Sequence, residues 1–148
     1  MPNYCQNQAT FTHADKEKVD ALFNEFQKFI DTDNKDGKPF QLLYPLPDDQ
    51  EANWYNWRVE NWGTKWDAMD AWNLERKDDN TFSVSFYTAW SPPTAWYSSI
   101  EDSGWSVDAI YFEAGMGFAG SYSDGNDEKI EVTDTLYRML NAKFDTAA

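Results

Sequence analysis

Hydrophobic and polar residues alternate in several stretches of the chain with the period of two that is typical of β-strands. The clearest stretch is 82–88, where Phe82, Val84 and Phe86 are separated by serines. Turn-forming residues at 77–80 and 123–126 predict two hairpins. Strands are predicted at residues 4–12, 66–76, 82–88, 105–113, 117–122 and 128–132.

Other apolar residues recur with helical spacing. The longest such stretch is 13–32, and Thr12 is predicted to cap its N-terminus. Between the first predicted helix and the next lies a polar loop at 31–53 with three prolines. The apolar stripe of the first helix is Val19, Leu22, Phe23, Phe26, Phe29 and Ile30. Further helices are predicted from about Trp54 to Gly63, from Ser91-Pro92-Pro93-Thr94 to about Ser103, and after Thr133, where Leu136, Leu140 and Phe144 recur.

This order of elements predicts an α+β fold. An antiparallel sheet with helices packed on one face fits it, and the ferredoxin-like split βαβ arrangement is the simplest named version. A C-terminal hairpin and helix would be added to that core. The chain shows no internal repeat and no low-complexity linker, so a single domain spanning 1–148 is expected.

The composition indicates a folded domain with a strongly acidic surface. The 148 residues include 8 Trp, 8 Tyr and 10 Phe, and the formal net charge is −14. Such a charge disfavours direct binding to nucleic acid or to an anionic membrane. The single cysteine, Cys5, excludes an internal disulfide, and no apolar run indicates a leader or a membrane span. A soluble protein with a cytoplasmic location is therefore expected.

No motif in the chain predicts catalysis. Residues 115–120 match G-x-G-x-x-G, but turn residues follow, so a hairpin is expected in place of a dinucleotide site. The only histidine, His13, is predicted to lie on the surface. A calcium loop starting at Asp31 needs glycine at its sixth position and glutamate at its twelfth, where the chain has Asp36 and Leu42. The chain also holds too few histidines and cysteines for zinc. No enzyme activity, catalytic residue, cofactor or metal is expected.

The segment 54–66 contains four tryptophans, with Arg58 and Lys65 among them. Two interpretations remain open. One is a packed aromatic cluster in which Arg58 pairs with acids, and the other is a groove that stacks a planar ligand. The candidate ligand-binding residues are Trp54, Trp57, Arg58, Trp62, Lys65, Trp66 and Trp90.

The last third of the chain carries half of the net negative charge. Residues 1–50, 51–100 and 101–148 carry net charges of −4, −3 and −7. Such a surface either attracts a basic protein or only confers solubility. The candidate partner-binding residues are Glu101, Asp102, Asp108, Asp124, Asp127, Glu128, Glu131 and Asp134.

Four groups of residues form a recognisable set of motifs: Met1–Cys5 with Asn7, the run 54–67, the run 88–93, and Tyr111, Glu113, Gly115, Phe118 and Gly120. These motifs resemble the YubB-type family of ferredoxin-like domains, which is encoded by phages, prophages and conjugative plasmids. The resemblance covers residues 1 to about 125 and implies a ferredoxin-like fold without an iron–sulfur cluster and without an established reaction. Residues 126–148 would then form an acidic C-terminal extension with its own helix.

These features together predict a non-catalytic interaction protein of a mobile element. It would inhibit a host nucleic-acid-binding defence or restriction protein by presenting carboxylates in place of phosphates. The partner would be a host protein with a basic surface, and the oligomeric state is left open. One alternative is a small-ligand binder or nucleotide sponge that uses the Trp-rich segment 54–66, and another is an assembly protein of a phage particle.

Overall fold

The computed structural model describes residues 3–131, which form an antiparallel sheet with helices on one face. Within these residues the sheet has six strands in the order β2-β3-β1-β4-β5-β6. Every neighbouring pair is antiparallel. The strands are β1 (Tyr4–Thr12), β2 (Met69–Asp78), β3 (Thr81–Ala89), β4 (Ser106–Glu113), β5 (Phe118–Ser123) and β6 (Asn126–Glu131).

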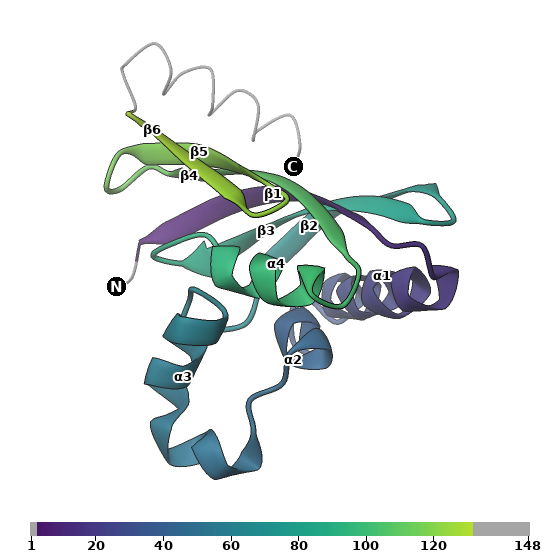
Figure 1. Ribbon diagram of the computed structural model, residues 1–148, viewed down its shortest axis with the longest axis horizontal. Helices are drawn as coiled ribbons and strands as arrows, with labels where there is room; N and C mark the ends of the chain where they lie inside the picture. Colours follow the sequence, from purple (N-terminus) through teal and green to yellow (C-terminus); the bar gives the residue numbers. More distant parts are fainter. Residues whose placement is uncertain (1–2, 132–148) are drawn as a thin grey trace.

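The helices lie together on the same side of the sheet (Figure 1). Helix α1 connects β1 to β2 and α4 connects β3 to β4, which with the strand order gives the predicted ferredoxin-like split βαβ arrangement. Strands β5 and β6 form the predicted additional hairpin. The helix expected after Thr133 lies outside the described residues. The helices are α1 (Lys16–Asp31), α2 (Pro39–Leu43), the 3-10 helix η1 (Asp48–Asn53), α3 (Trp54–Asn61) and α4 (Thr94–Glu101).

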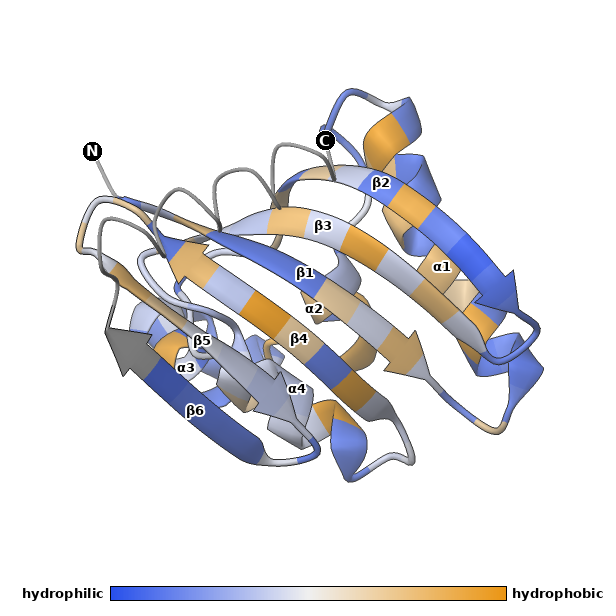
Figure 2. Ribbon diagram, turned by 90° about the horizontal axis from the view of Figure 1, so that it is seen from above, coloured by the Kyte–Doolittle hydropathy of each residue, from blue (hydrophilic) through white to orange (hydrophobic). Residues whose placement is uncertain are grey.

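The core lies between the sheet and the helices. Alternate residues of the central strands face the helices, and Phe11, Phe82 and Val107 are fully buried there. The apolar stripe of α1 packs against them as predicted. Figure 2 shows apolar positions recurring along β3 and β4, whereas β6 is hydrophilic. Among the side chains that the structure describes, this core extends across the sheet to Tyr122 of β5.

Helix α1 begins later than predicted, and its N-cap is Asp15 instead of Thr12. The Asp15 carboxylate accepts the N–H of Glu17 at 3.0 Å. Thr12 remains in β1, where its hydroxyl lies 3.2 Å from that of Thr81. The side-chain amide of Asn80 donates to the carbonyls of residues 13 and 14, and this contact fixes the chain between β1 and α1.

The predicted loop at 31–53 is wrong in part, because it contains α2 and η1. The Asp67 carboxylate accepts the N–H groups of Phe40 and Gln41 at 3.0 Å each and so caps α2 from far along the chain. Phe40 is fully buried, with its ring centroid 4.4 Å from that of Trp96. Helix α2 thus depends on tertiary contacts more than on its own sequence.

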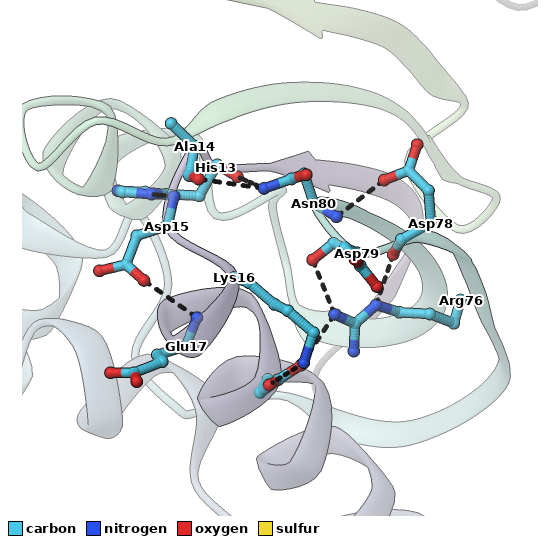
Figure 3. A network of polar contacts seen from close by, with 10 residues as sticks. His13, Ala14, Asp15, Lys16, Glu17, Arg76, Asp78, Asp79 and Asn80 are labelled. Carbon is cyan, nitrogen blue, oxygen red and sulfur yellow. Dashed lines mark hydrogen bonds and ion pairs between the residues drawn. The ribbon is translucent and has the colours of Figure 1, made fainter.

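The prediction that His13 lies on the surface is wrong, because the residue is only 8% exposed. Its Nδ1 accepts the N–H of Asp15 at 2.9 Å, so Nε2 carries the proton and donates to the carbonyl of Ser103 at 2.9 Å. The ring also packs edge-on against Trp105. Figure 3 shows the neighbouring polar contacts, in which Asn80 of the β2–β3 turn lies against His13 at the start of α1.

The glycines at 115–120 serve the β4–β5 hairpin, as predicted, and no helix follows them. Gly117 has a φ of +72°, which a turn requires and a residue with a Cβ rarely adopts. A Cβ added at Gly120 would overlap the ring of Tyr111 and would lie 2.5 Å from the carbonyl oxygen of Glu128. Gly120 is therefore needed because Tyr111 crosses directly over it.

We expect His13→Ala to lower the free energy of unfolding by about 1–3 kcal/mol, because the Asp15 N–H and the Ser103 carbonyl lose a partner next to the core. Urea denaturation would measure the change. Ala14→Ser, at the exposed neighbouring position, is the matched control and should leave the stability nearly unchanged. Equal stabilities for the His13→Ala variant and the unsubstituted protein would contradict this role.

We expect Gly120→Ala to destabilise the protein by about 1–3 kcal/mol, because the new methyl group overlaps the Tyr111 ring and a backbone carbonyl. Thermal unfolding followed by circular dichroism would measure this effect. Ser121→Ala, at an exposed position of the same strand, should change the stability by no more than about 0.5 kcal/mol. An unaltered melting temperature for Gly120→Ala would show that the crossing by Tyr111 is not a constraint.

Candidate functional site

The sheet order collects the acidic C-terminal part of the described chain at one side of the molecule. Strands β4, β5 and β6 are consecutive in the sheet, so the acidic residues that they carry lie together. Residues 94–131 contain eight acidic residues, and Lys129 is their only Lys or Arg. We call six of these acidic residues the acidic edge: Glu101, Asp102, Asp108, Asp124, Asp127 and Glu128.

Hydroxyl groups, and not cations, hold most carboxylates of the acidic edge. Ser123 donates to Asp108 at 2.5 Å and Ser106 donates to Asp124 at 2.8 Å. Tyr111 donates to Asp127 at 2.5 Å, and Tyr122 donates to Glu101. In the described part of the chain, the ion pairs use other acids: Asp20, Glu25 and Glu75.

The acidic edge brings like charges close together. The pKa of Glu101 is raised above its ordinary value, mainly because the carboxyl group is partly buried and next because Asp124 lies nearby. Burial and the neighbouring carboxylate of Asp127 likewise raise the pKa of Tyr111, so its hydroxyl stays protonated and remains a donor. Burial is the larger cause for both groups, and the neighbouring carboxylates raise the two pKa values further.

The candidate carboxylates do not share one face of the sheet. The strand register places Asp108 and Glu128 on the face away from the helices, whereas Asp127 lies on the helix side with Tyr111. Glu101 and Asp102 lie at the C-terminal end of α4, also on the helix side. The acidic edge consequently wraps around the border of the sheet. Glu131 is the last residue of β6, and Asp134 lies outside the described residues.

The Trp-rich segment divides into buried and exposed parts. Trp62 is fully buried, and its indole N–H donates to the carbonyl of Tyr44 at 2.9 Å. Trp57 packs against the Tyr44 ring at a centroid distance of 5.4 Å. These two tryptophans support the packed-cluster interpretation, because they connect α3 to the rest of the core.

The packed-cluster interpretation expected Arg58 to pair with acids, and the structure does not show this pairing. No described carboxylate lies within ion-pair distance of Arg58. Its guanidinium carbon instead lies 5.3 Å from the ring centroid of Trp54 and 5.0 Å from that of Trp62. One terminal nitrogen donates to the carbonyl of Lys65 at 3.4 Å, which is a long hydrogen bond.

Lys65, Trp66 and Trp90 form a second cation–aromatic group at the surface. The Lys65 ammonium lies 4.3 Å from the Trp66 ring centroid and 6.0 Å from that of Trp90. Trp90 is 49% exposed and has a φ of +71°, which is a strained conformation for a bulky residue. The backbone N–H of Trp90 donates to the backbone carbonyl of Asn3, and the hydroxyl of the neighbouring Ser91 donates to the backbone carbonyl of Gly63.

A pocket of about 710 Å³ opens beside α3. Arg58, Trp62 and Trp66 line part of it, and the polar segment 38–51 and residues 67–70 supply much of the remainder. Sequence reasoning missed Lys38, Asp48, Glu51, Asp67 and Asp70 among the lining residues, because the only signal was a polar loop.

Asp67 anchors one wall of this pocket. Its carboxylate accepts three backbone N–H groups, those of Phe40, Gln41 and Ala68. Burial nevertheless raises the pKa of Asp67 above its ordinary value. Because Asp67 connects residues 66–70 to the start of α2, it determines how far apart these two pocket walls lie.

Within residues 3–131 no group of three His, Cys, Asp or Glu side chains is placed to hold a metal ion. In the same residues no helix has the length and apolarity needed to cross a membrane.

Comparisons with known proteins identify the fold and no activity. No family model matches the chain, and no curated protein matches it. Among solved structures, the crystal structure of the protein api92 from Yersinia pseudotuberculosis, assigned to the family model DUF1281, is similar with a TM-score of 0.52 and 9% sequence identity. The match covers 90% of this chain and 99% of that one. At this identity the similarity extends to the fold alone.

Proposed function

We propose that this protein is a non-catalytic interaction protein whose acidic edge binds a basic surface of a nucleic-acid-handling protein. The supporting observation is that the six carboxylates of the acidic edge have no ion-pair partner among the described residues, while the described ion pairs involve other acids. The edge therefore presents a nearly undiluted negative charge to a partner. Carboxylates would stand there in place of the phosphates that the partner normally binds.

The hydroxyl contacts favour such binding because they order the carboxylates without neutralising them. A salt bridge to lysine would hold a carboxylate in place but would also cancel its charge. A bond from Ser106 to Asp124, or from Ser123 to Asp108, restricts the side chain and leaves the charge available. Groups that are already ordered lose less conformational entropy when a partner binds.

The uneven distribution of charge would also direct the encounter. Attraction between an acidic patch and a basic surface raises association rates and orients the two proteins before contact. Because the acidic edge wraps around the border of the sheet, it suits a partner with a concave basic surface, such as one that surrounds a nucleic acid. It suits a partner with a flat basic surface less well. As a setting we propose a phage or conjugative plasmid whose product inhibits a host defence or restriction protein, on the basis of the sequence resemblance.

The test is capture of partners from nuclease-treated bacterial lysate with the unsubstituted protein and with an edge variant. The edge variant carries Asp108→Asn, Asp124→Asn, Asp127→Asn and Glu128→Gln. We expect the unsubstituted protein to retain a DNA- or RNA-binding protein that the edge variant does not retain. Added duplex DNA or RNA should compete for the captured partner, because the two ligands would occupy the same basic surface.

A matched control removes four negative charges elsewhere, at exposed residues whose side chains make no hydrogen bond or ion pair with the described residues: Asp33→Asn, Asp36→Asn, Asp49→Asn and Glu60→Gln. It should bind the partner as the unsubstituted protein does. Equal loss of binding in both variants would show that only total charge matters. Unchanged binding by the edge variant, or a partner that binds nucleic acid and this protein simultaneously, would refute the phosphate-mimic proposal.

The closeness of charges at the edge can be checked directly. We expect Asp124→Asn to lower the pKa of Glu101, because it removes a negative charge that disfavours ionisation of that carboxyl. The pKa should stay above the ordinary value, since burial is the larger cause. Carboxyl chemical shifts followed by NMR across a pH series would measure it, with Asp102→Asn as the control. A pKa that does not respond to Asp124→Asn would contradict the described contact.

A further inference from the structure

Arg58 is an unusual feature in a chain with 26 acidic and 12 basic residues. It lies between two indole rings, has no described ion-pair partner, and makes one long hydrogen bond. Its Nε is buried and has no hydrogen-bond partner. An unpaired, partly desolvated donor is unfavourable in a structural role, because buried polar groups normally find partners.

The pocket beside α3 provides space for a ligand next to Arg58. Its volume of about 710 Å³ is within the range of small-molecule sites, which runs from about 300 to 1,000 Å³. Arg58 and Trp66 both line it, and Trp66 is 37% exposed, so part of its indole is available for stacking. A guanidinium beside an aromatic surface suits a ligand that combines an oxyanion with a flat ring.

The charges of the pocket restrict the ligand further. Lys38 and Arg58 are its two basic lining residues, and four acidic residues face them: Asp48, Glu51, Asp67 and Asp70. The lining is therefore net negative by two charges, which disfavours polyanions such as a nucleoside triphosphate. A ligand with a single acidic group would meet Arg58 and leave the acidic lining for its polar or amino groups.

We infer that this pocket binds a small planar molecule bearing one acidic group, with the oxyanion on Arg58 and the ring against Trp66. Two sources share this chemistry, nucleoside monophosphates and aromatic carboxylates. In both, the guanidinium fork can donate two parallel hydrogen bonds to the oxyanion. The inference is independent of the acidic edge, since no residue of that edge lines the pocket.

Isothermal titration calorimetry of the full chain tests the inference, with adenosine monophosphate, benzoate, adenosine, benzamide, inorganic phosphate and adenosine triphosphate as probes. We expect at least one of adenosine monophosphate and benzoate to bind. Its uncharged analogue, adenosine or benzamide, should bind about tenfold or more weakly. Phosphate without a ring and the triphosphate should also bind more weakly. Binding of only one of the two acids would identify the source.

Arg58→Gln should weaken binding of the preferred acid about tenfold or more, and Arg58→Lys should weaken it less. Lys18→Gln, an exposed charge change on α1 away from the pocket, should leave the affinity unchanged. Trp66→Leu should weaken binding about fivefold or more and provides the test if the Arg58 variants do not fold. Failure of both acids to bind, or binding unaffected by Arg58→Gln and Trp66→Leu, would overturn the inference.

Discussion

The packing of one aromatic ring, Phe11, holds the layers of this protein together. Phe11 lies on the central strand β1, and its ring contacts Phe26 of α1, Phe82 of β3, Trp96 and Tyr97 of α4, and Trp105. It is fully buried. Removing a buried phenylalanine ring costs about 3–5 kcal/mol in typical cores. Both crossover helices thus depend on one side chain of the strand between them, and the acidic edge and the pocket lie at the two margins of this layer.

Most strands could be predicted because their side-chain alternation is local. The pattern at 82–88 shows which face is buried, and the turn residues beside it mark the hairpin. The start of α1 and the existence of α2 could not be predicted in the same way. The N-cap Asp15 donates its backbone N–H to His13, Asn80 holds the carbonyls of residues 13 and 14, and α2 is capped by Asp67 from another part of the chain. Asn80 and Asp67 are far in the sequence from the residues that they hold and become their neighbours only when the chain folds.

The two candidate sites also differ in how far the local sequence predicts them. The acidic edge was predictable in outline, because the charge concentrated in the last third of the sequence becomes concentrated in space when β4, β5 and β6 are neighbours. The hydroxyl partners of its carboxylates were not predictable. For the Trp-rich segment, composition left open a packed cluster or a groove for a planar ligand, and the structure shows a buried part beside a pocket. Trp62 is buried while Trp66 is exposed, and only the tertiary structure shows that Arg58 has no described acidic partner.

The strand order has a consequence for how the chain is made. Strand β1 precedes the other strands in the chain, yet it pairs with β3 (Thr81–Ala89) and β4 (Ser106–Glu113), so its hydrogen-bonding partners leave the ribosome long after it. Until then both edges of β1 are unpaired, and pairing over such sequence distances favours slow folding. The centre of the sheet is therefore completed only after both crossover helices, α1 and α4, have been synthesised.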